Sequence, residues 1–215
     1  MAAIERTFDW KPRFDERSRN YRVSRLEGAL PEYKTWLCKP RLDQGAEGAC
    51  VGFSISHGIS SKPRSNIQTN TSARNLYYLA QTLDEWEGED YEGTSVLAGL
   101  KAAKQLELIE RYEWCFGIED IINTVSLQSP VVIGVNWYEG MMDVDANGFI
   151  HKTGLWVGGH AIEVIGVNNN KDKFKLRNSW GYWWGIRGNC LISFQDIESL
   201  IYEDGEVAVL KKPKL

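Results

Sequence analysis

The sequence predicts an α+β protein, because helical patterns come first and strand patterns follow. In residues 50–106 apolar side chains recur at helical spacing, whereas beyond Pro130 the chain turns to short runs rich in Val and Ile. That order favours two segregated layers or lobes. A chain of 215 residues can build one domain with an ample core. We expect one domain over 1–215, with an extended segment at 1–34, a mainly helical lobe at 35–127 and a mainly β lobe at 128–215.

The first helix is predicted by a single apolar stripe. Val51, Ile55 and Ile59 recur at every fourth residue, so the helix begins near Cys50 and is ended by Pro63.

Two more helices are expected, and one segment stays ambiguous. The second helix begins at Ser72 as a cap, and the third follows Thr94 and Ser95. Residues 118–127 fit a short helix, but their Ile and Val content leaves a strand open. The acidic loop 84–93 is either simply solvated or helps to admit basic substrates.

The second half alternates strands and turns. A polar turn is expected at 168–172, between two strands. The expected strands are 131–135, 161–167, 174–177, 189–194 and 207–210.

Composition excludes several classes of protein. The net charge is −4, with charges of both signs spread along the chain, so no basic face for nucleic acid is expected. The longest apolar run is too short to cross a membrane, and the charged first thirty residues do not resemble a signal peptide. The four cysteines form no Cys-x-x-Cys pair, so we expect no metal, no disulfide and a reducing, cytoplasmic location.

One cysteine stands out by its context. Cys50 follows the glycine-rich run 44–49 and falls on the first turn of the expected helix, where free N–H groups and the helix dipole favour a thiolate. The thiolate is the reactive form of cysteine. Cys50 is therefore the candidate nucleophile, and the other three cysteines are expected to be ordinary thiols.

Three histidines are available as the base. His57 lies two turns into the Cys50 helix and His151 lies in an expected turn, so both are the weaker candidates. His160 follows two glycines and leads into a strand, which supports a general base rigidly, although it could also be a satisfied histidine at a strand start. Asn178 can orient an imidazole and Trp180 can shield that hydrogen bond; the alternative is a turn before a core tryptophan.

Three segments together resemble the motifs of the papain-like cysteine peptidases. They are Gln44-Gly45 with Gly48-Ala49-Cys50, then Gly159-His160-Ala161, then Asn178-Ser179-Trp180-Gly181-Tyr182-Trp183-Trp184-Gly185. They occur in the family's order, and the resemblance covers about 35–210. It implies a two-lobed fold, with the nucleophile helix packed against a β-barrel-like lobe and the active-site cleft between them.

The resemblance also implies a role for each matched residue. Cys50 would be the nucleophile, His160 the acid and base, Asn178 the orienting amide and Gln44 the oxyanion donor. Trp180 would shield the site. No cofactor and no metal is implied.

Further residues are expected to bind the substrate. Gly159 and Trp180 belong to the matched motifs, and Gly93 and Thr94 lie where the family offers backbone atoms to a peptide. Glu47 and Glu92 would favour basic or neutral peptides.

Three departures from the family bear on function. Val51 stands where tryptophan is frequent, and Gly48 stands where many secreted members have a disulfide cysteine. The interval from Cys50 to His160 is short, so some loops around the cleft should be trimmed. No long inhibitory prosegment is expected: either residues 1–34 provide a short cover, or location, a partner or assembly controls activity.

The leading hypothesis is a thiol peptidase that cuts peptide bonds through a thioester, with a peptide or protein as its partner. One alternative is an inactive peptide-binding relative of the same fold. Another is a specialised amidase, transpeptidase or cell-wall hydrolase, since fold and catalytic parts do not fix the substrate. The oligomeric state is left open.

Overall fold

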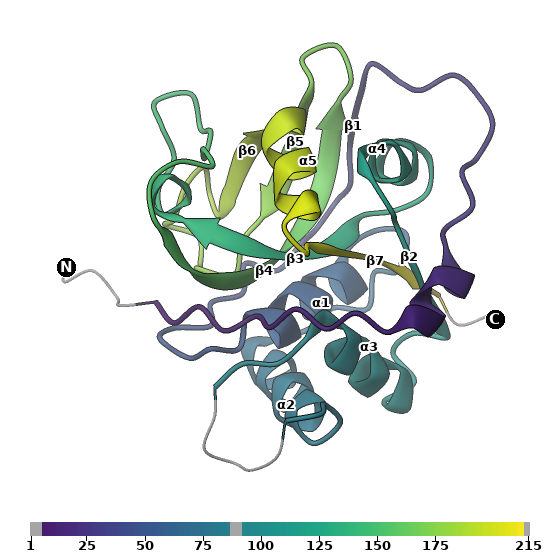
Figure 1. The fold of residues 1–215 in the computed structure, drawn as a ribbon, viewed down its shortest axis with the longest axis vertical. Coiled ribbons are helices and arrows are strands. Elements are labelled where there is room, and N and C mark those ends of the chain that lie inside the picture. The colour runs from purple at the N-terminus through teal and green to yellow at the C-terminus, as the bar shows by residue number, and fades with distance from the viewer. Residues whose placement is uncertain (1–5, 87–91, 213–215) are drawn as a thin grey trace.

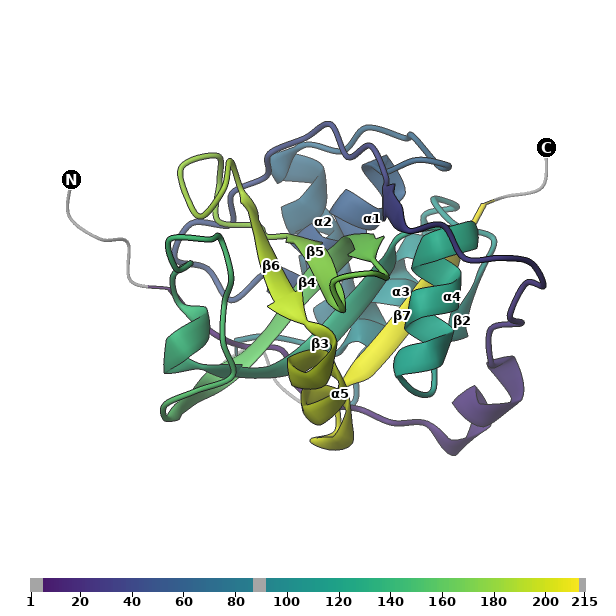
Figure 2. The same cartoon turned by 90° about the horizontal axis from the view of Figure 1, so that it is seen from above.

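A helical lobe and a β lobe lie against each other in the computed structural model, which describes residues 6–86 and 92–212. In Figure 1 the helices α1, α2 and α3 lie below the sheet. The view from above in Figure 2 places α4 and α5 beside the sheet, with α1 and α2 behind it. The α+β class predicted from the sequence is therefore confirmed.

Three helices form the helical lobe. They are α1 (Cys50–Ser60), α2 (Asn70–Gln81) and α3 (Val96–Gln105). Helix α1 is buried along its whole length, because α2, α3 and strands of the β lobe surround it. Helix α3 follows Thr94 and Ser95 as predicted, and Ser95 is its cap, but the predicted cap of α2 is wrong. Thr69 caps that helix, and Ser72 is its partner in a capping box, so the helix begins earlier than the apolar pattern indicates.

Antiparallel strands make up the sheet, in the order β2-β7-β3-β4-β5-β6, and β1 pairs with β4. Their bounds are β1 (Tyr33–Thr35), β2 (Arg111–Trp114), β3 (Val131–Tyr138), β4 (Trp156–Asn168), β5 (Lys173–Arg177), β6 (Asn189–Ser193) and β7 (Glu206–Lys211). The five predicted strands are all present. Strands β1 and β2 are short and were not predicted.

Two helices accompany the β lobe. Helix α4 (Ile118–Leu127) resolves the ambiguous segment: it is a helix that buries Ile121 and Val125 and packs on β4. Helix α5 (Phe194–Tyr202) was not predicted. Ser193 caps α5, so the expected strand 189–194 ends one residue early. Two short 3₁₀ helices are η1 (Glu16–Tyr21) and η2 (Glu139–Met141).

The sheet contributes to two separate cores. On one face, residues of β3 and β4 such as Ile133 and Ile162 pack with α4 and α5 in the β lobe. On the other face, Val132 and Ala161 pack against helix α1 through Ile55. Because neighbouring residues of a strand point to opposite faces, β3 and β4 serve both lobes and hold them in a fixed relation.

The segment before β1 crosses the boundary between the lobes, as the purple ribbon in Figure 1 shows. It pairs through isolated bridges from Asp9 to Gly159 and from Trp10 to Thr94, and later from Arg22 to Trp114. Residues 6–34 therefore wrap around the body of the protein, as predicted for the segment 1–34. The predicted loop 84–93 lies partly outside the described residues.

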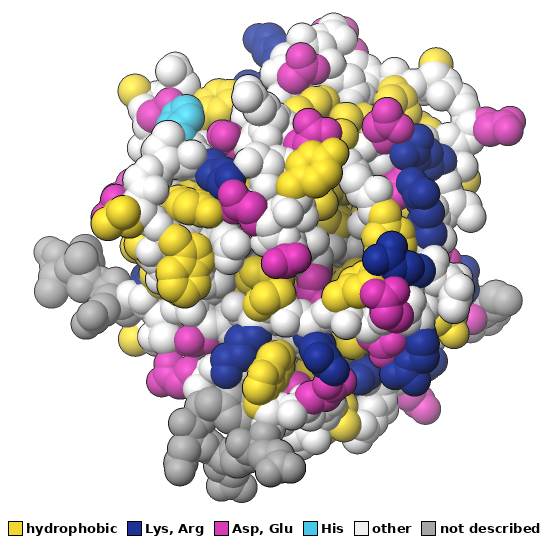
Figure 3. Space-filling view, in the orientation of Figure 1, with side chains coloured by type: hydrophobic (Ala, Val, Ile, Leu, Met, Phe, Trp, Pro, Cys, Tyr) yellow, Lys and Arg dark blue, Asp and Glu magenta, His cyan; other side chains and the backbone are white. Residues whose placement is uncertain are grey.

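Charges of both signs alternate over the face in Figure 3, with hydrophobic side chains among them. None of the helices within 6–86 and 92–212 is long and apolar enough to cross a membrane.

Candidate functional site

The thiol of Cys50 lies at the start of α1, at the interface between the lobes. Cys50 is the first residue of α1, and the cap residue Ala49 places no side chain over the helix end. The free N–H groups of this first turn therefore remain beside the sulfur. The backbone groups of Ala161, Asp9 and Val51 lie near the thiol and act to lower its pKa. Since Ala161 follows His160 directly, the fold brings the predicted nucleophile and base together.

The imidazole of His160 is held from the β lobe. His160 lies within β4, opposite Val135 of β3. Its Nε2 atom is 2.9 Å from the Oδ1 atom of Asn178. That oxygen also accepts a hydrogen bond from the backbone N–H of Ser179, at 2.8 Å. The Asn178 carboxamide thus fixes one ring nitrogen, while Nδ1 is buried without a hydrogen-bond partner.

Aromatic rings enclose this imidazole. The ring centroids of Trp137, Trp180 and Phe8 lie 4.7, 5.0 and 6.0 Å from that of His160. Trp180 takes the shielding place that the motif implies. Trp137 was missed, although its place two residues after Val135 in the apolar run puts it on the same face of β3 as the partner of His160.

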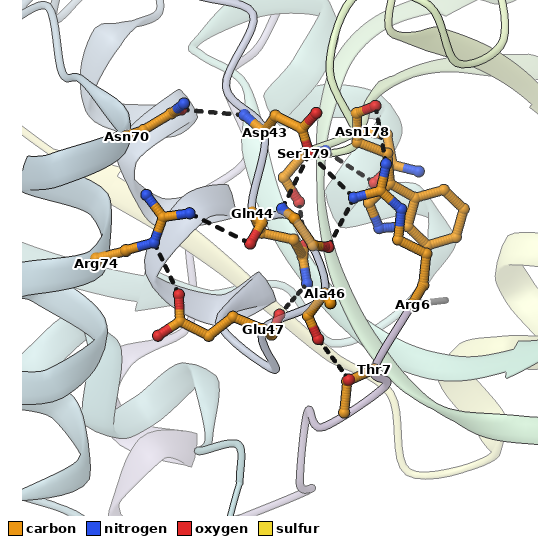
Figure 4. A network of polar contacts seen from close by, with 12 residues as sticks. Arg6, Thr7, Asp43, Gln44, Ala46, Glu47, Asn70, Arg74, Asn178 and Ser179 are labelled. Carbon is orange, nitrogen blue, oxygen red and sulfur yellow. Dashed lines mark hydrogen bonds and ion pairs between the residues drawn. The ribbon is translucent and has the colours of Figure 1, made fainter. Parts of the chain in front are cut away.

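Gln44 is fixed by contacts to both lobes, as Figure 4 shows. Its Oε1 atom accepts a hydrogen bond from Ser179 Oγ at 2.7 Å, and its Nε2 donates to the carbonyl of Glu47 at 2.9 Å. The backbone of Gln44 also donates to the carbonyl of Ser179. An amide nitrogen carries two hydrogens, so one donor of Gln44 is left for another acceptor.

The loop that carries Gln44 is anchored on α2. Arg74 donates to Glu47 at 2.8 Å, and Tyr78 donates to its other oxygen at 2.6 Å. Asn70 accepts a hydrogen bond from the backbone of Asp43. Glu47 was predicted to favour basic or neutral peptides, but both of its carboxylate oxygens are bound by residues of α2.

Residues 6–11, which we call the cover, lie across this site. Arg6 pairs with Asp43 and donates to the carbonyl of Gly45, and Thr7 donates to the carbonyl of Ala46 (Figure 4). The guanidinium of Arg6 also lies 5.6 Å from the ring centre of Trp180. The cover is thus tied to the loop that precedes Cys50.

The backbone of the cover is held by both walls of the site. Thr94 donates to the carbonyl of Asp9 at 3.2 Å, and Trp10 donates to the carbonyl of Gly159 at 2.9 Å. Glycine is needed on both sides of the cover, at positions 93 and 159. A Cβ atom on Gly93 would lie 1.8 Å from the Asp9 carbonyl oxygen, and one on Gly159 would lie 2.0 Å from that of Trp10. The predicted substrate-binding residues therefore surround an extended peptide, which here belongs to the chain itself.

Burial under the cover sets the protonation of the site. Cys50 and His160 are both fully buried. Loss of solvent raises the pKa of the Cys50 thiol to about 11, although three backbone hydrogen bonds act in the opposite direction. It lowers the pKa of His160 to about 4, against the effect of the hydrogen bond between the imidazole and the Asn178 carboxamide oxygen. Both groups are therefore neutral at pH 7 while the cover is in place.

The other histidines are placed away from this cluster. His57 is buried in α1, where desolvation lowers its pKa. His151 is exposed and pairs with Asp145 at 3.0 Å. All four cysteines are unpaired and buried. Among the described residues, no group of three or more His, Cys, Asp or Glu side chains could hold a metal ion.

A helical lobe packed against a β lobe, with Cys50 on the first and His160 on the second, is the arrangement of the papain-like fold. Solved structures agree with this class. The chain is similar to xylellain, a cysteine protease from Xylella fastidiosa, with a TM-score of 0.75, 15% identity and coverage of 100% of this chain and 99% of that one. It is also similar to bromelain from Ananas comosus, with a TM-score of 0.64, 16% identity and coverage of 86% and 100%. The two-lobed papain-like fold is therefore confirmed.

Sequence relatives point the same way. The chain is 23% identical over 193 residues to an uncharacterized peptidase C1-like protein of Acanthamoeba polyphaga mimivirus, covering 68% of this chain and 62% of that protein. It is 24% identical over 148 residues to cathepsin B-like cysteine proteinase 3 of Caenorhabditis elegans, covering 68% and 35%. The chain thus spans less than two thirds of the length of these relatives. No family model matches it. The resemblance to the papain-like cysteine peptidases that the motifs predict is confirmed.

Proposed function

We propose that this chain is a cysteine peptidase that hydrolyses peptide bonds through a covalent thioester. Its relatives carry the names of cysteine proteinases and peptidases. The residue types that such chemistry needs converge on the lobe interface: Cys50 from α1, His160 from β4 and Asn178 beside it.

The observation that carries the proposal is the peptide already held at the site. An extended segment lies against Cys50, and its backbone is bound by Thr94 on one side and Gly159 on the other. Backbone hydrogen bonds of this kind bind a peptide whatever its side chains. A site that binds an extended chain beside a candidate nucleophile supports a peptide or protein substrate.

The reaction needs the thiolate and imidazolium pair, which forms when the cover leaves and water reaches the site. The sulfur of Cys50 attacks the peptide carbonyl, and the C–N bond breaks as His160 gives its proton to the leaving amine. Water then attacks the thioester, and His160 takes the water's proton. The acid product leaves and the thiolate returns.

Two donors would stabilise the oxyanion that forms in each step. The second hydrogen of the Gln44 amide is one donor, and the backbone N–H of Cys50 at the start of α1 is the other. Asn178 keeps the imidazole facing the sulfur through its bond to Nε2.

We infer that the cover blocks the site in the position it occupies. The Asp9 carbonyl oxygen accepts a hydrogen bond from the backbone N–H of Thr94, and Arg6 and Thr7 hold the segment to the loop before Cys50. The structure thus corresponds to a resting form of the proposed peptidase.

Hydrolysis of a peptide library tests the proposal. We expect products from the wild-type chain, more from Trp10→Ala, whose cover is weakened, and a loss of at least about 10⁴-fold on adding Cys50→Ala. Matched substitution of the buried Cys190 should leave turnover unchanged. Robust cleavage by a well-folded Cys50→Ala protein would overturn the assignment.

A second candidate function is binding of a peptide without cleavage. The observation in its favour is that the site is occupied and both reacting groups are neutral. If Trp10→Ala binds peptides, yet its Cys50 reacts with no epoxide inhibitor of cysteine peptidases, the binding function is correct. Substrate profiling separates a peptidase from an amidase, transpeptidase or cell-wall hydrolase.

A further inference from the structure

We propose that the cover is a pH-dependent latch, which closes the site under acidic conditions and releases it as the pH rises, because closing it buries the carboxyl groups of Asp9 and Glu206. This inference rests on the proposed function for its biological meaning, since it names how that site would be regulated. Its structural part can be tested without any catalysis.

Trp10 is the main anchor of the cover. Its side chain is 3% exposed and packs in the core of the helical lobe. The indole fits because β3 has no side chain at that point: a Cβ atom on Gly134 would lie 2.1 Å from the indole nitrogen. The indole N–H donates to Glu206 Oε2 at 3.0 Å. Gly134 is the register partner of both Glu206 and Ala161, so these three residues form one side of the pocket.

Glu206 becomes buried beneath that indole. The residue is 7% exposed, and burial raises the pKa of its carboxyl to about 8. Hydrogen bonds from Trp10 and from the backbone of Arg13 and Val96 oppose this shift only in part. Arg13 belongs to the same N-terminal segment as Trp10, so departure of that segment would expose the carboxyl to water and remove two of its hydrogen bonds. The other titratable groups that line this region are Asp204 and Cys115.

Asp9 directly precedes Trp10 and faces the loop before Cys50. A Cβ atom on Gly48 would lie 2.0 Å from Asp9 Oδ2, and that oxygen is buried without a hydrogen-bond partner. Burial is the largest cause that raises the pKa of Asp9 to about 6, followed by the carboxylate of Glu92. Lys11 acts in the opposite direction. The titratable groups Cys50 and Tyr77 also feel the charge of Asp9.

The sign of the effect follows from these shifts. The closed form holds a proton on Glu206 that the open form loses, so closure is favoured below about pH 4.5 and this contribution disappears as the pH rises through about 8. Asp9 acts in the same direction between about 3.8 and 6. His160, whose pKa in the closed form is about 4, takes up on opening the proton that Cys50 loses.

Above pH 6.5, Glu206 therefore determines how the opening of the cover depends on pH. Between about pH 4.5 and 6 Asp9 adds to the contribution of Glu206. Proton transfer from Cys50 to His160 on opening leaves the total number of bound protons unchanged. One group that loses a proton on opening raises the opening constant by up to about tenfold per pH unit.

Hydrogen exchange of residues 6–14, measured by mass spectrometry and corrected for the intrinsic rate, reports opening directly. From pH 6.5 to 8 we expect the opening constant of the wild-type chain to rise by about tenfold or more. Glu206→Gln keeps an acceptor for the indole but cannot titrate, so its opening constant should be flat over this interval. Glu198→Gln, an exposed position on α5, is the matched control and should behave as wild type.

The remaining outcomes separate the two claims. The latch is overturned if wild type and Glu206→Gln share one pH dependence, or if opening decreases as the pH rises. The Trp10 indole N–H signal, assigned with Trp10→Phe, must shift with the same midpoint as the exchange. If opening follows the expected profile but an epoxide inhibitor never labels Cys50, the proposed function fails and the latch stands.

Discussion

The nucleophile and the base are held in different ways. Cys50 begins an 11-residue helix whose residues are all buried, so its position follows from local helix formation and from packing of that one helix. His160 is enclosed by rings from three distant parts of the chain, which are Phe8, Trp137 and Trp180. A change near Cys50 should therefore act through α1, whereas the surroundings of His160 should respond to changes far away in sequence.

The difference also determines which kind of substitution should destabilise each site. Helix α1 tolerates little added volume, because α2 approaches it closely at one glycine. The cage around His160 tolerates little loss of volume, since each ring fills a place that no neighbour can take.

The largest effect is expected from Trp137→Ala. Trp137 is fully buried, so its truncation should lower the free energy of unfolding by about 3–5 kcal/mol. Because burial is the main cause of the lowered pKa of His160, water admitted to the cavity should raise that pKa. Urea unfolding and an NMR titration of the imidazole measure the two effects. A raised stability or an unchanged imidazole pKa would contradict the cage.

Gln44→Ala tests the proposed oxyanion donor, which lies on the loop before α1. Loss of one oxyanion donor should reduce kcat by about 10²–10³-fold. The variant should be assayed with Trp10→Ala present, so that the cover does not limit the rate. Arg74→Ala is a useful comparison, because it removes a contact of the same loop without touching the reacting atoms, and it should leave kcat within a few-fold. Equal losses in the two variants would mean that Gln44 only supports the loop.

Gly52→Ala probes the packing of the Cys50 helix. The new Cβ atom would lie 2.5 Å from the carbonyl oxygen of Ala73, so we expect a destabilisation of about 1–3 kcal/mol. Gly58→Ala is the matched control within α1, because its nearest neighbours are side-chain carbons at 3.3 Å. There the gain in helix propensity should leave stability unchanged or slightly higher. Similar results at both glycines would show that α2 does not constrain α1 as described.

The smallest effect is expected at the helix caps, where the two lobes should behave alike. Ser95 accepts a hydrogen bond from Ala98 N–H in α3, and Ser193 accepts one from Asp196 N–H in α5. Replacing either serine by alanine should cost about 1 kcal/mol in thermal or urea unfolding. A loss of stability in only one of the two variants would show that the two caps do not contribute equally to stability.

Prediction from the sequence worked where local pattern determines structure. Helix α1, the start of α3 after Ser95 and the five strands after Pro130 follow from spacing and turn residues, and the motifs singled out His160 and Asn178, which the structure joins by a hydrogen bond. The cap at Thr69 was missed because a capping box places two acceptable cap residues three positions apart.

The features that were missed depend on distant contacts. Trp137 gains its role only when β3 pairs with β4, and strands β1 and β2 are too short to show a pattern of their own. Residues 1–34 were expected to wrap the body, but nothing local indicates that Trp10 fits over Gly134 and reaches Glu206. Contacts between residues so far apart in the chain leave no periodic pattern in the sequence.

The most direct test of the central claim is the site of covalent labelling by an epoxide inhibitor of cysteine peptidases. The protein should carry Trp10→Ala and be analysed intact and as peptides by mass spectrometry. We expect one label per chain, on Cys50, abolished in the presence of His160→Ala, while the buried thiols at 38, 115 and 190 remain unmodified. A folded protein whose Cys50 stays unlabelled, or reacts equally well without His160, would contradict the account.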